Sequence, residues 1–432
     1  MRLTILGGGG FRVPLVYRAL AAGSPVTEVV LHDVAPARLA AIGAVLAEMA
    51  ALARRDAPAV RTTTDLDAAL AGARFVFSAM RVGGLAGRTV DERVALDHGL
   101  LGQETTGPGG IAYGLRTVPV AVRVAERVAA LAPDAWVVNF TNPAGMITEA
   151  MQRVLGDRVV GICDSPAGLV HRAARALGVP PDGLAVDYVG LNHLGWLRAL
   201  RVDGVDLLPR LLADDAALAT VEEVRLVGAD WVRALGALPN EYLYYFYRAR
   251  EAVAAIRAAP STRGEFLLAQ QERFYAGHGD ALRRWTAVRE ERDATYMAEG
   301  RAASGAGERA VEDVAAGGYE GVALDLVAAL SGGPARAMIL DVRNGSTVPG
   351  LPPEAVVEVP CLAGPHGVTP LATAPLTGAM LGLVQQVKAV EQDTIEAALT
   401  GSSALALRAF AQHPLVDSVA VAQDLLAAYL RP

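Results

Sequence analysis

The chain opens on a short apolar run, residues 2–6, that ends in four consecutive glycines, residues 7–10. Apolar residues then recur at helical spacing over residues 13–20. A second apolar run begins at Val29 and is followed by His32 and Asp33. Apolar runs bounded by turn residues predict buried strands, and a helical period predicts a helix. The opening segment therefore predicts a strand, a tight turn, a helix and a second strand.

The same alternation continues to about residue 168. Further apolar runs at residues 75–78, 136–140 and 159–162 predict strands, and helix-patterned stretches separate them. Alternating strands and helices are typical of a parallel sheet with helices on both faces. We therefore expect residues 1–168 to form a doubly wound α/β domain whose ligand lies at the carboxyl ends of the strands.

Beyond residue 168 the pattern changes to long stretches rich in Ala, Leu and Arg. Helical patterns cover residues 221–236, 248–258, 265–275, 281–304 and 382–399, and strand patterns cover 337–342 and 355–361. This mixture predicts a second, helix-rich α+β domain over residues 169–432. The length of 432 residues agrees with two domains, because single cores stop growing at roughly 250–300 residues.

Composition narrows the setting of the protein. The chain is 52% hydrophobic, yet charged residues, Gly or Pro interrupt every apolar run before the roughly 18 residues of a membrane helix. No signal peptide is visible, and two cysteines, Cys163 and Cys361, are too few for a disulfide framework. The formal charge of −7 and the absence of a basic stripe argue against nucleic acid as a partner. We expect a cytoplasmic protein without a membrane segment.

The glycine-rich turn predicts a dinucleotide site in a Rossmann-like fold. Gly7 and Gly9 let a pyrophosphate approach the backbone at the start of the following helix. Asp33 stands at the end of the second strand, where an acidic residue hydrogen-bonds the ribose of NAD. Arg12 replaces the third glycine of the usual motif. A plain strand, turn and helix without a nucleotide therefore stays open as the alternative.

Cys163 and His193 are candidate metal ligands. Cys163 follows the predicted strand at 159–162, and His193 ends the run Gly-Leu-Asn-His at 190–193. Two ligands are too few for a structural zinc site, but they suit an open site completed by water or substrate oxygens. Ligand softness alone favours zinc or ferrous iron. The alternative is an ordinary buried cysteine and a solvated histidine.

Three further polar clusters follow predicted strands: RVGGLAGR at 81–88, GQETTGPGG at 102–110 and NFTNPA at 139–144. Each by itself is typical of an ordinary loop. Together they indicate a binding site, because loops after consecutive parallel strands converge on one crevice. The aromatic run at 242–247 is first explained by packing, but a tyrosine there can act as a base if a cation lowers its pKa from about 10.

Together these motifs resemble glycoside hydrolase family 4, the NAD-dependent glycosidases. The resemblance covers nearly the whole chain and includes GIC at 161–163, GLNH at 190–193, T-R-x-E at 262–265 and HPL at 413–415. It implies that hydride passes from C3 of a sugar to NAD, that a base removes the C2 proton, and that the C1 substituent leaves before water adds. The most similar branch is that of the 6-phospho-β-glucosidases, so the implied substrate is a phosphorylated sugar.

The resemblance also implies catalytic and metal-binding roles. Cys163 and His193 correspond to metal ligands, with manganese as the usual divalent ion. Tyr242 corresponds to the base at C2. Asp164 stands where the β-branch has asparagine, and an aspartate there is typical of the α-glucosidase branch, in which it protonates the leaving group. Overall similarity thus favours the β-anomer, and Asp164 keeps 6-phospho-α-glucosides open.

The substrate and cofactor ends are implied in the same way. Asn142 corresponds to a substrate-contacting asparagine, and Arg88 and Arg263 correspond to arginines near the sugar phosphate, where a guanidinium can bond two oxygens. Gly7, Gly9 and Asp33 correspond to the cofactor end. Residues 10–15 read GFRVPL where relatives carry Ser-x-Tyr-Thr-Pro-Glu. Arg12 is therefore expected to contact an anion in place of the lost hydroxyls.

Two other hypotheses and one expectation on assembly remain. A 2-hydroxy acid dehydrogenase shares a similar fold, but such enzymes use a His paired with Asp and need no cysteine ligand. A non-catalytic sugar-phosphate sensor would follow if the altered segment at 10–15 prevented cofactor binding. The resemblance implies a homodimer or a homotetramer, and the helix-rich second half offers apolar surface for it.

Overall fold

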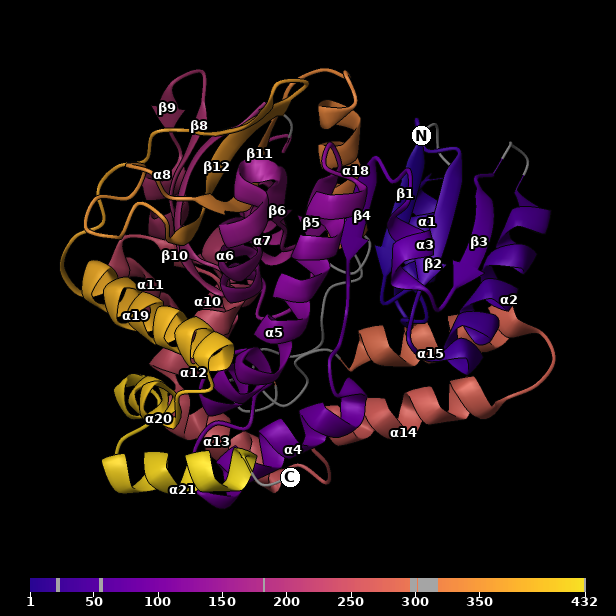
Figure 1. Ribbon diagram of the computed structural model, residues 1–432. Coiled ribbons are helices and arrows are strands. Elements are labelled where there is room, and N and C mark those ends of the chain that lie inside the picture. Colours follow the sequence, from indigo (N-terminus) through magenta and orange to yellow (C-terminus); the bar gives the residue numbers. More distant parts are fainter. Residues whose placement is uncertain (21–23, 54–56, 182, 296–300, 302–317, 431–432) are drawn as a thin grey trace.

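The computed structural model describes residues 1–432 apart from 21–23, 54–56, 182, 296–300, 302–317 and 431–432. Within the described residues, thirteen strands form one mixed sheet in the order β10-β8-β7-β12-β11-β6-β5-β4-β1-β2-β3, with β13 beside β12 and β9 beside β8. In Figure 1 this sheet crosses the molecule from β3 on the right to β8 on the left.

The first half of the chain forms the parallel part of the sheet. Its elements are β1 (Arg2–Leu6), α1 (Val13–Leu20), β2 (Glu28–His32), α2 (Pro36–Leu52), β3 (Ala59–Thr63), α3 (Leu66–Leu70), β4 (Phe75–Ser78), α4 (Gly84–Asp97), α5 (Pro108–Leu131), β5 (Trp136–Asn139), α6 (Ala144–Leu155), η1 (Gly156–Arg158) and β6 (Val159–Gly161). The strands pair in parallel in the order β3-β2-β1-β4-β5-β6. The predicted doubly wound sheet and its five predicted strands are confirmed.

The second half adds helices and an antiparallel extension. Its elements are α7 (Ser165–Leu177), β7 (Ala185–Leu191), β8 (Leu194–Val202), β9 (Val205–Asp206), α8 (Leu208–Ala213), α9 (Asp215–Leu218), α10 (Glu222–Val227), α11 (Ala229–Leu235), β10 (Leu238–Pro239), η2 (Glu241–Leu243), α12 (Tyr244–Tyr247), α13 (Ala249–Ala258), α14 (Arg263–Ala276), α15 (Ala281–Ala294), α18 (Tyr319–Leu330), β11 (Arg336–Arg343), β12 (Val356–Gly364), β13 (Gly367–Pro370), α19 (Gly378–Thr400), α20 (Ser403–Gln412) and α21 (Val419–Tyr429). The expected helix-rich α+β second half is confirmed.

The two halves share the sheet. Strand β11 runs antiparallel to β6, β12 to β11, and β7 to β12, so strands from residues 336–364 lie between β6 and β7. The predicted boundary at residue 168 falls just after β6, inside this continuous sheet. The division into domains 1–168 and 169–432 stays a prediction.

The strand register brings the polar motifs to one edge. Across the sheet, the row of paired residues near that edge is Gly190, Glu358, Asp341, Gly161, Asn139, Ser78, Leu6 and His32. The loops after β1, β2, β4, β5 and β6 leave from the carboxyl ends of parallel strands, where doubly wound proteins bind ligands. The turn after β7 leaves from the same edge.

Some predicted bounds differ from the structure. The helix predicted over 221–236 is two helices, α10 and α11, because Gly228 adopts a φ of 97° and interrupts it. The helix predicted over 281–304 starts as expected, but most of its residues after 295 lie outside the described ones. Strand β3 escaped prediction because its sequence, AVRTT, is an exposed edge without an apolar run.

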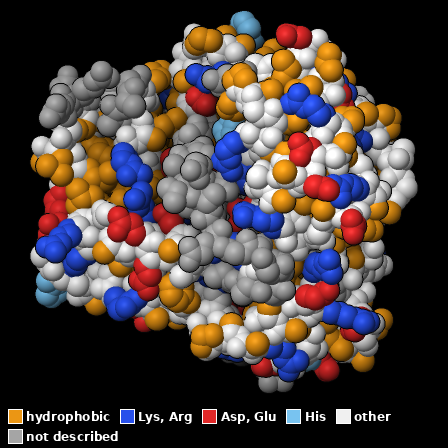
Figure 2. All heavy atoms as spheres, turned by 180° about the vertical axis from the view of Figure 1, so that it is seen from behind, with side chains coloured by type: hydrophobic (Ala, Val, Ile, Leu, Met, Phe, Trp, Pro, Cys, Tyr) orange, Lys and Arg blue, Asp and Glu red, His pale blue; other side chains and the backbone are white. Residues whose placement is uncertain are grey.

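The surface carries charges of both signs. On the face shown in Figure 2, basic and acidic side chains are interspersed and neither dominates. No helix in the described ranges is both long enough and apolar enough to cross a membrane.

Candidate active site

A cleft of about 1320 Å³ lies at the carboxyl edge of the parallel strands. Its walls combine the loops after β1, β2, β4, β5, β6 and β7 with residues of η2, α14 and α15. The structure brings nine of the ten predicted site residues to its wall: Gly7, Asp33, Arg88, Asn142, Cys163, Asp164, His193, Tyr242 and Arg263. The tenth, Gly9, does not line the cleft, but its N–H donates a hydrogen bond to Asp33, which lines it.

The glycine turn is shaped for close backbone approach. Gly7 has a φ of 78°, and a Cβ there would lie 2.5 Å from the carbonyl oxygen of Ala79, so only glycine fits. The Gly9 N–H donates to Asp33 Oδ2 at 3.0 Å, and the Ala35 N–H donates to Asp33 Oδ1 at the same distance. The carboxylate of Asp33 is thus fixed at the end of β2, facing the cleft beside the glycine turn.

Arg12, which replaces the third glycine of the motif, bridges two parts of the cleft. Its guanidinium lies over the ring of Tyr319, 4.1 Å from the centroid, and the Tyr319 hydroxyl donates to the Arg12 carbonyl. The same guanidinium comes within 3.8 Å of Asp164 Oδ2. Arg12 therefore connects the glycine turn with the aspartate that follows Cys163.

Cys163 and His193 enter the cleft from the ends of β6 and β7. Both are buried, and Cys163 is a free thiol. Burial, helped by the charges of Glu358 and Asp164, raises the pKa of the Cys163 thiol, and burial lowers the pKa of His193 to about 4. A neutral imidazole keeps a lone pair for a metal, whereas the thiol needs a nearby cation to ionise.

The donor set suits an open metal site. His193 Nδ1 lies 3.0 Å from the Thr105 hydroxyl, a contact that orients the ring and fixes which nitrogen faces the cleft. Asn142 Oδ1 is buried in the wall without a hydrogen-bond partner among the described residues. Among the residues that the structure describes, no group of three or more His, Cys, Asp or Glu side chains is placed to hold a metal ion. A thiol and an imidazole would leave further positions for water or substrate.

Tyr242 lies against His193. The two rings stack with their centroids 3.6 Å apart and 4° between their planes. The backbone N–H of Tyr242 donates to Asn240 Oδ1 at 3.0 Å, which starts the 3₁₀ turn η2. Tyr242 thus lines the same cleft as Cys163 and His193.

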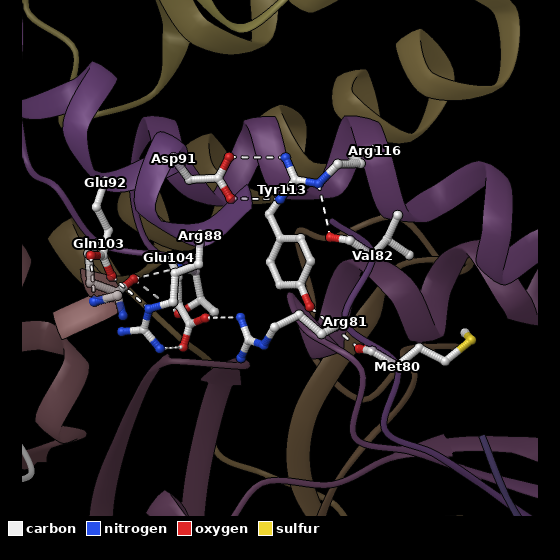
Figure 3. A network of polar contacts seen from close by, with 12 residues as sticks. Met80, Arg81, Val82, Arg88, Asp91, Glu92, Gln103, Glu104, Tyr113 and Arg116 are labelled. Carbon is white, nitrogen blue, oxygen red and sulfur yellow. Dashed lines mark hydrogen bonds and ion pairs between the residues drawn. The ribbon is translucent and has the colours of Figure 1, made fainter. Parts of the chain in front are cut away.

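A buried network fixes Arg88 at the start of α4. Arg88 donates through Nε to Glu92 at 2.7 Å and through Nη1 to Glu104 at 2.6 Å, and Arg81 also donates to Glu104. Figure 3 shows both guanidinium groups converging on that carboxylate. Burial alone would raise the pKa of Glu104, but the charges of Arg81 and Arg88 lower it to about 2. Glu104 therefore stays ionised and holds both arginines in place.

Arg263 contacts the end of α15. Its Nη1 donates to the carbonyl and hydroxyl of Thr295, and its Nη2 donates to the carbonyl of Arg292. Arg292 itself lines the cleft, and no hydrogen bond or ion pair of its guanidinium is found among the described residues. Burial and the positive charges of Arg12, Arg263 and Arg88 lower the pKa of Arg292 to about 9.

Sequence analysis missed three residues that shape the site. Arg292 lies in a helix rich in Arg and Glu, where no pattern separates it from its neighbours. Thr105 and Glu104 belong to the GQETTGPGG cluster, which was recognised only as a group. Thr105 lies beside His193 and Glu104 lies beside Arg88 because of tertiary contacts that sequence spacing does not reveal.

Comparison with known proteins agrees with this geometry. Residues 3–179 match the family model described as "Family 4 glycosyl hydrolase", and residues 188–416 match "Family 4 glycosyl hydrolase C-terminal domain". A probable 6-phospho-beta-glucosidase of Bacillus subtilis is 32% identical over 379 residues, which cover 85% of this chain and 80% of the relative. The 6-phospho-alpha-glucosidase 1 of Lacticaseibacillus paracasei is 30% identical over 394 residues, covering 87% and 84%.

A solved structure extends the likeness to three dimensions. The 6-phospho-beta glucosidase from Thermotoga maritima, determined with manganese, NAD+ and glucose-6-phosphate, superimposes with a TM-score of 0.83 at 25% identity. The match covers all of this chain and 98% of that protein.

Proposed function

Since the chain belongs to family 4 of the glycosyl hydrolases, we propose that it cleaves 6-phosphoglucosides with NAD and a divalent metal ion, Mn2+ in the first place. The observation that carries this proposal is the concentration of guanidinium groups at the cleft. Besides burial, the nearby charges of Arg12, Arg263 and Arg88 lower the pKa of Arg292, although the carboxylates of Glu92, Glu104 and Asp164 are nearby. A dianionic phosphate relieves such a concentration of positive charge. A neutral sugar does not.

The arginines are suited to a phosphate in different ways. Arg88 is held from two sides by Glu92 and Glu104, so its position is fixed before a ligand arrives. Arg292 has its guanidinium free of hydrogen bonds to the described residues, so its donors are available. Planar guanidinium donors match phosphate oxygens in pairs, which gives geometric selectivity as well as attraction.

The cofactor and the metal fit the residues that line the other walls. Gly7, Gly9 and Asp33 would hold NAD, and Cys163 and His193 would hold the metal. When bound, NAD supplies a hydride acceptor and the metal supplies a positive charge beside the sugar oxygens. The low pKa of His193 agrees with this assignment, because a neutral imidazole keeps a lone pair for a metal.

Two side chains are placed to move protons. We assign Tyr242 as the base that removes the C2 proton, because its phenol lies at the wall of the cleft against His193. We assign Asp164 as the acid that protonates the leaving oxygen, because it lines the same cleft directly after Cys163. Both assignments follow the chain's own geometry and the resemblance together.

The anomeric preference is proposed as β, with α as the second candidate. Similarity to the relatives of Bacillus subtilis and Thermotoga maritima favours β. Asp164, in place of the asparagine of the β-branch, and the relative of Lacticaseibacillus paracasei favour α. The family match gives no support to the alternative of a 2-hydroxy acid dehydrogenase.

The test is a comparison of four substrates. The purified protein is incubated with NAD+, Mn2+ and a reductant, together with 4-nitrophenyl α- and β-glucosides with and without the 6-phosphate. We expect release of 4-nitrophenol from the phosphorylated compounds only, faster for β, with no net accumulation of NADH. Cleavage of the unphosphorylated glucosides at equal rates would overturn the phosphate claim, and NADH rising with substrate loss would favour a dehydrogenase.

We also propose a homodimer or homotetramer that works in the cytoplasm. The C-terminal helices leave apolar side chains exposed, Val419 at 60% and Leu430 at 56%, which an interface could cover. The two cysteines are buried free thiols, which suits a reducing compartment. Light scattering of the purified protein measures the assembly, and a monomer would contradict it.

A further inference from the structure

A buried carboxylate lies behind the site, outside the cleft. Glu358 is the third residue of β12, is 1% exposed, and pairs across the sheet with Asp341 on β11 and Gly190 on β7. Its strand neighbours in the sequence VVEVPC, residues 356–361, are apolar and buried. A carboxylate in such a position costs free energy unless hydrogen bonds satisfy it, and an apolar residue would suit the core better.

The first oxygen of Glu358 holds the turn that carries His193. Asn192 Nδ2 donates to Glu358 Oε1 at 3.2 Å. Asn192 and His193 form the two-residue turn between β7 and β8, and His193 has a φ of 64°, which is uncommon for a residue with a side chain. The bond to Glu358 therefore anchors a turn whose backbone does not adopt this shape by default.

The second oxygen reaches Tyr242 through two side chains. The Tyr188 hydroxyl donates to Glu358 Oε2 at 2.9 Å, and Asn240 Nδ2 donates to the same hydroxyl at 3.3 Å. Asn240 Oδ1 in turn accepts from the backbone N–H of Tyr242 at 3.0 Å. Tyr188 and Asn240 are both buried, at 0% and 1% exposure, so water does not compete for these contacts.

The two arms end on the segments that carry the two stacked rings, at the Asn192 side chain and at the backbone N–H of Tyr242. His193 and Tyr242 come from different segments, the turn after β7 and the turn η2, yet their centroids lie 3.6 Å apart. We propose that Glu358 is a positioning residue that fixes these rings relative to each other through Asn192 on one side and Tyr188 with Asn240 on the other. This role rests on the proposed function, which makes His193 a metal ligand and Tyr242 the base.

Breaking one arm at a time separates the two effects. Tyr188→Phe removes only the arm to Tyr242, so we expect kcat to fall about tenfold while KM and the Kd for Mn2+ stay within twofold. Glu358→Gln cannot accept from Asn192 and Tyr188 together, so we expect a similar loss in kcat and an increase of about tenfold in the Kd for Mn2+. Loss of an outer partner of a metal ligand typically costs about 10- to 100-fold in affinity or activity.

Asp341→Asn is the matched control. Asp341 is paired with Glu358 across the strands and is equally buried, but both of its oxygens lack a hydrogen-bond partner among the described residues. The control converts a buried carboxyl group of the same row to an amide without removing any hydrogen bond of the two arms. We expect its kcat and its Kd for Mn2+ to stay within twofold of the unaltered protein.

The Kd is measured by the electron paramagnetic resonance signal of free Mn2+, and folding by the thermal midpoint. The proposal is overturned if Glu358→Gln keeps both kcat and Kd within twofold, or if Asp341→Asn loses as much as Glu358→Gln. If Glu358→Gln does not fold, Tyr188→Phe decides: an unchanged kcat overturns the proposal. If the unaltered protein binds Mn2+ but cleaves no phosphorylated glucoside, the proposed function is wrong. The positioning role is still tested in that case by comparing the Kd for Mn2+ of Glu358→Gln and Asp341→Asn.

Discussion

Replacing Arg292 with glutamine should weaken substrate binding and stabilise the empty protein at the same time. A hydrogen bond from a charged donor contributes about 1.5–3 kcal/mol net, which at 1.4 kcal/mol per tenfold corresponds to about 10- to 100-fold in affinity. Repulsion from Arg12, Arg263 and Arg88 is relieved when Arg292 is removed. The loss of affinity should therefore lie near the lower end of this range, as an increase of about tenfold in KM for a 6-phosphoglucoside.

In the absence of substrate, Arg292→Gln should stabilise the folded protein. The pKa of Arg292 lies at about 9, below its usual 12.5, so at neutral pH the folded protein holds this charge at a cost that unfolding removes. Arg292→Gln should then raise the thermal midpoint of the ligand-free protein, and added glucose 6-phosphate should raise it less than in the unaltered protein. Binding is measured by calorimetry with glucose 6-phosphate and by KM.

Arg283→Gln is the control, because Arg283 lies exposed on the same helix, α15, away from the cleft. It should leave KM within twofold. A KM for the phosphorylated substrate that changes less than threefold in Arg292→Gln would refute the reasoning. So would an equal loss for phosphorylated and unphosphorylated glucosides, since only the former carry the charge that Arg292 is proposed to bind.

Three further substitutions test other parts of the site. Gly7→Ala should abolish NAD+ binding in a calorimetric titration, because its methyl group would lie 2.5 Å from the Ala79 carbonyl oxygen at a φ of 78°; unchanged affinity would contradict the assigned turn. Glu104→Gln should cost stability mainly above pH 4.5. The pKa of Glu104 drops from 4.5 to about 2 on folding, so its ion pairs with Arg81 and Arg88 stabilise the protein fully above the unfolded value and are lost as the pH falls towards 2. Urea unfolding at pH 6 and pH 2.5 should show a smaller difference from the unaltered protein at the lower pH, and equal differences would argue against the ion pairs. Tyr242→Phe should lower kcat at least about 100-fold with an unchanged thermal midpoint, as expected for a general base; a full rate would remove the residue from that role.

The parallel half of the fold was predictable because each buried strand there is a short apolar run between turn signals. The run FVFS of β4, for example, is buried at every position and cannot be confused with an amphipathic helix. Strands β7 and β8 gave no such signal. Their sequences mix Asp, Tyr, Arg and Gly with apolar residues, and they form a hairpin whose pairing comes from contacts across the sheet.

Some residues of the candidate site could likewise be predicted from the sequence, and others could not. The positions of Asp33 and Cys163 after predicted strands indicate a site, because parallel strands end at a common edge, whereas Asn142 stands out from its cluster at 139–144 only through the family resemblance. Glu358 sits inside a strand, and Arg292 sits within a charged helix. Their importance depends on which partners the tertiary structure places beside them, and local sequence does not encode that information.

The insertion of late strands between early ones explains why the site needs both halves of the chain. Cys163 follows β6 and His193 follows β7, only thirty residues later, yet β11 and β12 separate these strands in the sheet. At about 4.8 Å per strand, β6 and β7 are held about 14 Å apart along the sheet, which leaves room for a sugar between the segments that follow them. The same inserted strand β12 carries Glu358, whose hydrogen bond to Asn192 fixes the turn of His193. Strands from residues 336–364 thus set both the width of the gap and the orientation of one of its walls.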